Sequence, residues 1–545
     1  MSAQMTSPAR SGTAAGSAPS RTGFGGLIRA EWTKFRSVRG WVIGMILAAA
    51  LMVFMGVFVA ANGTIGCQMN GGPAKTGKAC LPYIPHGPGG EVVSDSFYFV
   101  RQPLTAHGSI TARVTSLTGE HAAINGQHVQ VGTGSMVAGL ASWAKAGIII
   151  KQSTKQGSAY AAMMVTGSNG VRMQYNFTSD TAGLPGKVTA AHPRWLRLTR
   201  SGDTITGYDS ADGVHWTKVG TARIAGLPPT VQAGMFATSP SYTVAQKSFG
   251  GSSYQGGPAQ ATGIFDHVSL SGATPGGTWA GTAIGRGGPV AFGPGGTGTR
   301  SFTRAGGTFT VTGSGDIAPV TPGPGSSLPT VTVEQSLVGV FIGLIAIVVV
   351  AAMFFTAEYR RGLIRTTLAA TPRRGAVLAA KALVAGAVAF VAGLIASVIS
   401  IAVGVPKEEN HGQVLLTVHA LTEVRIIVGT AALVAVAAVF AVALGAVLRR
   451  SAAAITVAVV AVVLPFLLVG LNIVPAGIGA WLLRVTPAAG LAIQQSIPRY
   501  HQVTNVLSPV QGYYPLSPYA GFAVLCVWAA AALGLALVLL RRRDA

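Results

Sequence analysis

Apolar residues gather in six stretches of the chain, each about 20 residues long and free of charged side chains. They run over Trp41–Ala61, Leu337–Phe355, Ala382–Val405, Ile426–Val447, Ala452–Ile473 and Tyr519–Leu540. A helix that rises about 1.5 Å per residue crosses a hydrocarbon core of about 30 Å over this length, so each stretch predicts a membrane span. Pro465 and Asn472 interrupt the fifth stretch, and we expect its outer end to be broken or re-entrant.

The composition of the chain agrees with a polytopic membrane protein. Charged residues make up 10% of the 545 residues, where a globular protein carries about 25%, and the mean hydropathy is +0.49. These values exclude a disordered chain, a coiled coil and an ordinary cytosolic enzyme.

The first stretch has two interpretations, because Val59, Ala60 and Ala61 resemble a signal-peptide cleavage site. Its apolar region exceeds the usual length of about 7–15 residues, and a long segment precedes it. We interpret it as an anchor.

Basic residues predict the orientation of the spans. They occur before the first span, between the second and third, between the fourth and fifth, and after the sixth, where Arg541, Arg542 and Arg543 follow. With six alternating spans all four segments share one side, which the positive-inside rule makes cytoplasmic. Both termini are then cytoplasmic, and residues 62–335 are extracellular. Much of the net charge of +23 is therefore a topology signal, and no nucleic-acid partner is expected.

The long insertion after the first span has a different pattern. Short alternating runs such as Leu196–Thr199 and Phe265–Leu270 are separated by turn pairs such as Asp212-Gly213. They predict an all-β sandwich or jelly roll over 95–271, inserted into a helical membrane protein. A Gly-rich loop over 62–94 precedes it, and a Gly- and Pro-rich extension and stalk over 272–335 follows, in which Gly307–Gly313 predicts one extra strand before a flexible stalk. Residues 1–26 are expected to form a disordered tail.

The segment His192–Trp216, with Trp195-Leu-Arg-Leu followed by Ser210-Ala-Asp-Gly-Val-His-Trp216, resembles the concanavalin-A-like jelly-roll domains appended to many bacterial glycosidases. The resemblance covers about 95–271 and implies the fold and a carbohydrate or cell-wall glycan ligand. Trp143, Trp195 and Trp216 are then candidate sugar contacts, although such rings more often fill the space between two sheets.

Two cysteines lie in the Gly-rich loop. External thiols tend to pair in oxidising surroundings, so we expect a disulfide between Cys67 and Cys80. We expect no metal site, because further ligands at suitable spacing are lacking. The nearby Gly72–Ala79 is close to the sequence pattern of a phosphate-binding loop. Ala79 stands where that pattern requires the Ser or Thr that would hold magnesium, so we do not interpret the segment as a nucleotide site.

Two segments on the predicted cytoplasmic side indicate what the protein does. In residues 27–41, Leu27, Ile28, Trp32 and Phe35 recur at helical spacing, which predicts an amphipathic helix lying in the membrane interface and leading into the first span. The second segment, 358–381, places cations at both ends of a short apolar run.

Together these segments resemble the membrane subunits of ATP-binding-cassette exporters for drugs, polysaccharides and antibiotics. The matching residues are Glu31, Trp32 and Lys34 in the elbow helix, and Glu358, Gly362, Leu368, Pro372, Arg373 and Lys381 after the second span. The resemblance implies a permease without catalytic residues or bound cofactor, whose separate ATPase subunit holds ATP and Mg²⁺. It further implies a homo- or heterodimer of permeases. The segment expected to couple to the ATPase comprises Glu358, Arg360, Arg361, Gly362, Leu363, Thr366, Leu368, Pro372, Arg373 and Lys381.

Three functions stay open at this point. The first is an exporter permease in the bacterial plasma membrane, moving a drug, peptide, lipid or glycan. The second is a membrane-anchored protein that binds or senses cell-wall glycan, in which the basic segments only grip anionic lipid. The third is a membrane enzyme, which the absence of acidic, basic or metal-binding residues from the six spans disfavours.

Overall fold

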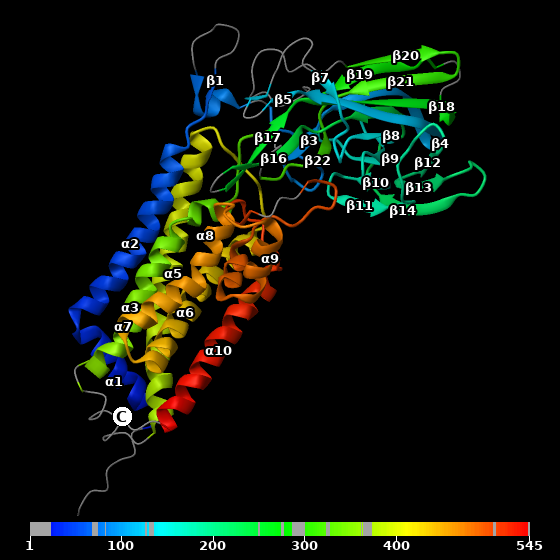
Figure 1. Ribbon diagram of the computed structural model, residues 1–545. Helices are drawn as coiled ribbons and strands as arrows, with labels where there is room; N and C mark the ends of the chain where they lie inside the picture. Colours follow the sequence, from blue (N-terminus) through cyan, green and yellow to red (C-terminus); the bar gives the residue numbers. More distant parts are fainter. Residues whose placement is uncertain are drawn as a thin grey trace, which may run out of the picture.

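The computed structural model describes residues 23–67, 75–81, 83–125, 128–129, 136–248, 251–273, 277–285, 300–322, 328–360, 362, 373–504 and 508–542. A long helical bundle carries a β-rich domain at one end, and the helices run side by side away from it (Figure 1). The β-domain is inserted between α2 and α3, as the alternating pattern of the insertion predicts.

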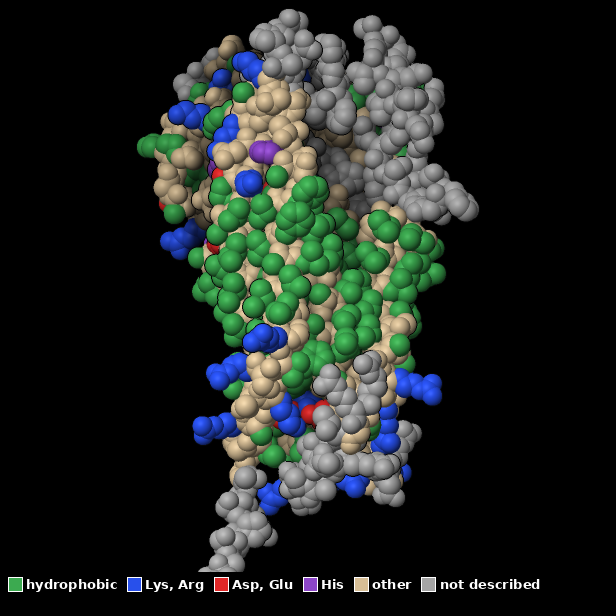
Figure 2. Space-filling view, turned by 90° about the vertical axis from the view of Figure 1, so that its left-hand side faces the viewer, with side chains coloured by type: hydrophobic (Ala, Val, Ile, Leu, Met, Phe, Trp, Pro, Cys, Tyr) green, Lys and Arg blue, Asp and Glu red, His purple; other side chains and the backbone are tan. Residues whose placement is uncertain are grey.

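Six helical segments of the described chain are long and apolar enough to cross a membrane. They are Arg39–Asn62 (α2), Val333–Tyr359 (η2 and most of α3), Arg374–Asn410 (α5), Ala420–Leu448 (α6), Ser451–Gly470 (α7 and α8) and Pro518–Arg542 (α10). The prediction of six spans is confirmed, and the chain is a multi-pass membrane protein. A continuous apolar belt separates the β-domain from a basic end of the bundle (Figure 2).

The fifth span is broken at its proline. Helix α7 (Ser451–Val462) ends one residue before α8 (Leu464–Gly470), and Pro465 lies in the first turn of α8. A proline lacks the backbone N–H, which has no helical partner in a first turn anyway. Beyond this span, α9 (Ala476–Val485) and the 3-10 helix η3 (Pro487–Gln494) meet at an angle of 94°.

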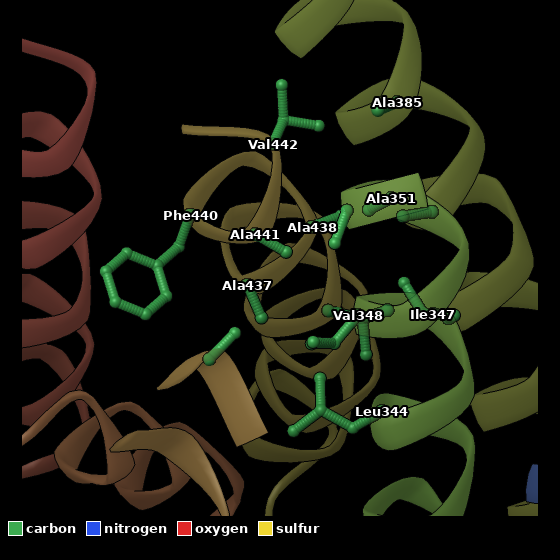
Figure 3. Close-up of a cluster of buried hydrophobic side chains, with 14 of the residues drawn as sticks. Leu344, Ile347, Val348, Ala351, Ala385, Ala437, Ala438, Phe440, Ala441 and Val442 are labelled. Carbon is green, nitrogen blue, oxygen red and sulfur yellow. The ribbon is translucent and has the colours of Figure 1, made fainter. Parts of the chain in front are cut away.

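Helix α6 (Ala420–Leu448) is the centre of the bundle and packs against α3 (Val340–Arg360), α5, α7, η3 and α10. Its face towards α3 consists of Ala437, Ala438 and Ala441, opposite Leu344, Ile347, Val348 and Ala351 (Figure 3). Small side chains let helix backbones approach closely, and in lipid this close packing replaces the hydrophobic effect as the main attraction between helices.

Helix α2 packs against two glycines four residues apart, Gly339 in the turn just before α3 and Gly343 in its first turn. A Cβ built on Gly339 would lie 1.9 Å from the carbonyl oxygen of Met52, and one on Gly343 would lie 2.0 Å from Cγ of Met52. Any larger residue at 339 would therefore push against the backbone of α2.

The β-domain is a sandwich organised by one very long strand, β4 (Phe97–Ala122). Strands follow the order β11-β10-β9-β8-β15-β4-β12-β13-β14, and β18, β19 and β7 also pair with β4. The sheet folds over so that β9 and β10 pack against β13 and β14, around a core that includes Ile148, Ile150, Leu196 and Phe265. The predicted sandwich is confirmed.

Most strands of the described chain have three or more residues, and six have two. The longer ones are β3 (Val93–Asp95), β4, β7 (Met136–Ala138), β8 (Lys145–Lys151), β9 (Tyr160–Thr166), β10 (Val171–Tyr175), β11 (Ser179–Ala182), β12 (Arg194–Ser201), β13 (Thr204–Ser210), β14 (Thr217–Arg223), β15 (Val231–Thr238), β16 (Tyr242–Ser248), β17 (Gly251–Gly257), β18 (Ala259–Ala273), β19 (Ala280–Ile284), β20 (Ser301–Ala305), β21 (Thr308–Gly313) and β22 (Ile317–Pro319). The two-residue strands are β1 (Gly66–Cys67), β2 (Lys75–Thr76), β5 (Ile124–Asn125), β6 (His128–Val129), β23 (Thr330–Val331) and β24 (Val414–Leu415).

Residues 272–335 are only partly the stalk that their glycine content suggests. Strands β19, β20, β21 and β22 lie in this range and pair with β4, β18 and β3. Strand β22 also brings Asp316 to the buried Lys145, at 2.6 Å. These described residues complete the sandwich and do not form a linker.

The β-domain is attached to the bundle at several points besides its two chain connections. Strand β23 pairs in parallel with β24, which follows α5. The side-chain amide of Gln502 donates to the carbonyl of Phe177 (2.6 Å), and the hydroxyl of Thr417 donates to that of Gly90 (3.1 Å). Val92, Val320, Val414, Leu416 and Ile497 form a shared apolar cluster. The β-domain therefore packs directly against the segments that connect the helices at this end of the bundle.

The crossing of α2 and α3 provides a test of the bundle. Gly339→Ala should destabilise the protein, because the added methyl group meets the carbonyl of Met52. Gly534→Ala in α10 is the matched control, since an added Cβ there meets nothing within 4 Å. That control should be neutral or slightly stabilising, because alanine favours a helix by about 1 kcal/mol over glycine. Melting temperatures in detergent that fall equally for both variants would contradict this packing.

Candidate functional site: a buried charge cluster

Four charged side chains meet at the end of the bundle that faces away from the β-domain. We call Glu31, Lys34, Glu358 and Lys381 the charge cluster. The Lys381 ammonium lies 2.7 Å from Glu31 Oε2 and 2.8 Å from Glu358 Oε1. The Lys34 ammonium lies 2.8 Å from Glu31 Oε1 and 3.2 Å from Glu358 Oε1. Each lysine thus bridges the same two carboxylates.

Three helices supply these side chains. Glu31 and Lys34 belong to α1 (Phe24–Ser37), Glu358 lies in the last turn of α3, and Lys381 lies in the third turn of α5 (Arg374–Asn410). Residues 361–372, which connect α3 to α5, are therefore bracketed by two members of the cluster. Acidic and basic side chains stand next to one another below the apolar belt (Figure 2).

Aromatic rings close the cluster towards the bundle. The Lys381 ammonium lies 4.5 Å from the centre of the Phe354 ring. Phe35 and Trp41 each pack edge-on against the same ring, at 5.4 and 6.1 Å between centroids. These contacts exclude water from Lys381 and fix α1 against α3.

The electrostatic balance of the cluster depends on its completeness. The side chain of Lys381 is 0% exposed and that of Glu31 is 4% exposed, whereas that of Lys34 is 42% exposed. Burial tends to lower the pKa of Lys34, but its hydrogen bond to Glu31 and the charge of Glu358 raise that pKa above its usual value. Two carboxylates face two ammonium groups, so the cluster is neutral overall, and the loss of any single member leaves it with a net charge.

Glu358 and Lys381, the two ends of the predicted coupling segment, are both buried, at 9% and 0% exposure. They hold the ends of α3 and α5 together, and their part in coupling to an ATPase stays a prediction. Their burial is tolerated because each finds an opposite charge inside the protein, on the other helix and on α1.

The rest of the predicted coupling segment is only partly described. Gly362 is exposed with a φ of 67°, and an added Cβ would meet nothing within 4 Å. Arg373 is exposed, and the neighbouring Arg374 donates from Nη1 to the carbonyl of Leu540 at 2.8 Å. The predictions for Arg361, Leu363, Thr366, Leu368 and Pro372, and for the side chain of Arg360, fall outside the described residues.

The predicted elbow helix is present as α1, and Trp32 is 45% exposed, as an interfacial face allows. The sequence did not indicate that Glu31 and Phe35 are buried against the bundle, each at 3% exposure. The sequence analysis also missed Phe354, whose ring lies 4.5 Å from the Lys381 ammonium. Glu31, Phe354 and Lys381 are far apart in the chain, so periodicity within one helix does not reveal their contacts.

The three tryptophans proposed as sugar contacts lie against arginines. Trp143 is buried, with the Arg172 guanidinium 5.7 Å from its ring, so it offers no face to a sugar. Trp195 and Trp216 are half-buried, with the guanidinium groups of Arg113 and Arg197 at 5.5 and 3.9 Å. Sugar contact by the latter two stays a prediction.

The cysteines agree with the expectation as far as they are described. Cys80 is disulfide-bonded, and Cys526 in α10 is free. The side chain of Cys67 lies outside the described part, so its pairing with Cys80 stays a prediction.

A family model matches the C-terminal part of the chain. Residues 313–545 match the family model described as ABC-2 family transporter protein, and this range includes β22, β23, η2 and the last five spans. No curated protein matches the chain.

Several solved structures resemble parts of the chain at low similarity. One is the GH43 protein BlXynB from Bacillus licheniformis, with 16% identity, 31% of this chain, 28% of that chain and a TM-score of 0.19. Another is a functionally unknown protein from Saccharomyces cerevisiae, with 15% identity, 38% of this chain, 92% of that chain and a TM-score of 0.21. A third is scytalido-glutamic peptidase, with 8% identity, 41% of this chain, 98% of that chain and a TM-score of 0.24. The chain spans little more than a quarter of BlXynB, and at these scores the likenesses support no inference about activity.

The charge cluster predicts unequal effects for its two lysines. Lys381→Met should lower the free energy of unfolding by about 3–5 kcal/mol, because it leaves two buried carboxylates with one half-exposed cation. Lys34→Met is the matched control and should cost about 1 kcal/mol or less, as expected for a partly exposed ion pair. Unfolding titrations in mixed micelles would check this. Equal losses for the two variants would show that burial does not govern the cluster.

Proposed function

We propose that this chain is the permease subunit of an ATP-binding-cassette transporter, which works with a separate ATPase subunit. The observation that carries the proposal is the charge cluster, which joins α1, α3 and α5 on both sides of residues 361–372. The match of 313–545 to the ABC-2 transporter family supports it.

The orientation of the proposed permease follows from its basic end. Arg373, Arg450, Arg541 and Arg542 are exposed at the end of the bundle that carries the charge cluster. By the positive-inside rule this end is cytoplasmic, so both termini and residues 361–372 face the cytoplasm and the β-domain is extracellular. A cytoplasmic ATPase therefore reaches the 361–372 segment and the elbow helix α1 but not the β-domain.

The charge cluster explains how a displacement of residues 361–372 would be transmitted to α1, α3 and α5. Lys381 is held at 2.7 and 2.8 Å by carboxylates of α1 and α3, so the cytoplasmic ends of three helices form one unit. When two ATPase subunits close on ATP and Mg²⁺, a displacement of residues 361–372 passes to α3 and α5 together. Rigid-body motion of packed helices is a common way to open a pathway alternately to each side.

The β-domain moves with the outer ends of the spans, because it is attached through β23–β24 and through Gln502. We propose that the transporter exports its substrate past this domain, as a homo- or heterodimer of permeases. The substrate is a drug, peptide, lipid or glycan. A glycan-sensing anchor without transport is the alternative, which predicts no ATPase partner.

Purification of the tagged full chain from its native membrane tests the proposal. We expect an ATP-binding-cassette ATPase in stoichiometric amount. Recovery of the chain without any ATPase, under conditions that keep related permeases and ATPases together, would overturn the proposal in favour of the glycan-sensing anchor.

Gly362 allows a sharper version of the same test. Gly362→Trp places a large side chain on an exposed turn with open space around it, so it should abolish ATPase co-purification while membrane insertion stays intact. Gly362→Asn is the matched control, because asparagine tolerates the left-handed backbone that φ of 67° requires, and it should keep the ATPase. Retention of the ATPase by the tryptophan variant would remove this segment from the docking surface.

A further inference from the structure

A further buried acidic residue, Glu334, lies at the opposite end of the bundle and has no counter-charge among the described residues. Glu334 belongs to the 3-10 helix η2 (Val333–Leu337), which leads into α3, and it is 9% exposed. Its Oε1 accepts from the backbone N–H of Ser496 at 3.3 Å, and its Oε2 has no hydrogen-bond partner. No ion pair to Glu334 occurs within the described ranges.

Two hydroxyl groups lie beside this carboxylate. They belong to Thr332 and Ser496, and these residues are 0% and 6% exposed. Neither hydroxyl has a hydrogen-bond partner other than the carboxylate beside it. The neighbour of Tyr513, Gly512, lies directly on the carboxylate, since a Cβ built there would be 1.9 Å from Glu334 Oε1.

The nearby arginines do not neutralise Glu334. Arg425 donates from Nη2 to the carbonyl of Gln495 at 2.5 Å, and Arg499 donates from Nη2 to the carbonyl of Tyr514. Both guanidinium groups thus hold the backbone around Glu334 instead of pairing with its side chain. A buried carboxylate without compensation is costly, so it takes up either a proton or a cation.

The set of oxygens favours a cation of single charge. When the carboxyl is ionised, Glu334 Oε2 is an acceptor only, and the hydroxyls of Thr332 and Ser496 each carry lone pairs. A protonated carboxyl would donate to one of these oxygens and leave the other unused. Divalent ions such as Ca²⁺ are usually held by several carboxylates, whereas one carboxylate among neutral oxygens balances one positive charge.

We propose that Glu334, together with the oxygens of Thr332 and Ser496, binds a monovalent cation. The site spans three segments: the start of α3, the chain after η3, and the turn at Gly512 after η4 (Pro509–Gln511). The cation would hold the segments that cover the outer end of the bundle against α3. The inference stands apart from the proposed transport function, because it concerns an ion bound by this chain alone.

The test uses the purified full chain in detergent, with chloride salts of Na⁺, K⁺, ammonium and choline compared at equal ionic strength. We expect a saturable rise in melting temperature with one of the small cations over choline, on the order of 5 °C well above the dissociation constant. A response to Na⁺ or K⁺ identifies an inorganic ion, and a response to ammonium alone identifies an amine.

Variants separate this site from a general salt effect. Glu334→Gln should lose the response and should be at least as stable as the wild type in choline, because it removes an unbalanced charge. Ser496→Ala should keep the fold and shift the response to higher cation concentration. Glu408→Gln is the matched control: Glu408 is also buried, at 3%, but its Oε2 accepts from the hydroxyl of Ser336 at 3.0 Å, and this variant should respond like the wild type.

Three results would overturn the site. One is an equal melting temperature in all four salts. Another is an equal response in the wild type and in Glu334→Gln, which would show an effect of the salt elsewhere. The third is a stability of the wild type that changes with pH but not with the cation, which would show that Glu334 carries a proton.

Discussion

The ammonium group of Lys381 lies inside the protein, and the arrangement of three helices follows from the need to neutralise it. A cation that is 0% exposed is tolerable only next to opposite charge, and the two carboxylates that provide it come from α1 and α3. These helices also meet through Phe35 and Phe354, which shield the cation from water. Because the same contacts bracket residues 361–372, stability and proposed coupling depend on one interaction.

The two ends of the bundle handle buried charge differently. At the basic end two lysines balance two glutamates within the chain, whereas at the β-domain end Glu334 has only neutral polar groups beside it. The proposed cation would balance this second site, which lies where the segments after η3 meet the spans.

Much of the fold is predictable from local patterns, since uninterrupted apolar stretches define the six spans and alternation defines the sandwich. The charge cluster is only half predictable. Glu31 and Glu358 stand out as acids in basic segments, but their meeting at Lys381 joins residues about 350 positions apart in the chain. Periodicity assigned Trp32 to the interfacial face of the elbow helix and Glu31 to its polar face, because a charged residue normally faces solvent unless an oppositely charged residue from elsewhere in the chain pairs with it. The length of the predicted glycine-rich stalk was overestimated for a similar reason. Glycine content indicates only the conformational freedom of the local backbone, whereas the strands from Ala280 to Pro319 form because they pair with β4, β18 and β3.

The most direct test of the account is a double-mutant cycle on the charge cluster, with the co-purified ATPase as the readout. Glu358→Gln and Lys381→Met each leave an unbalanced buried charge, so each single variant should lose most of the ATPase. The double variant leaves the Glu31–Lys34 pair, which meets at 2.8 Å, and should recover much of it. A double variant that loses as much as the two single changes combined would contradict the claim that charge balance in this cluster holds the coupling segment in place.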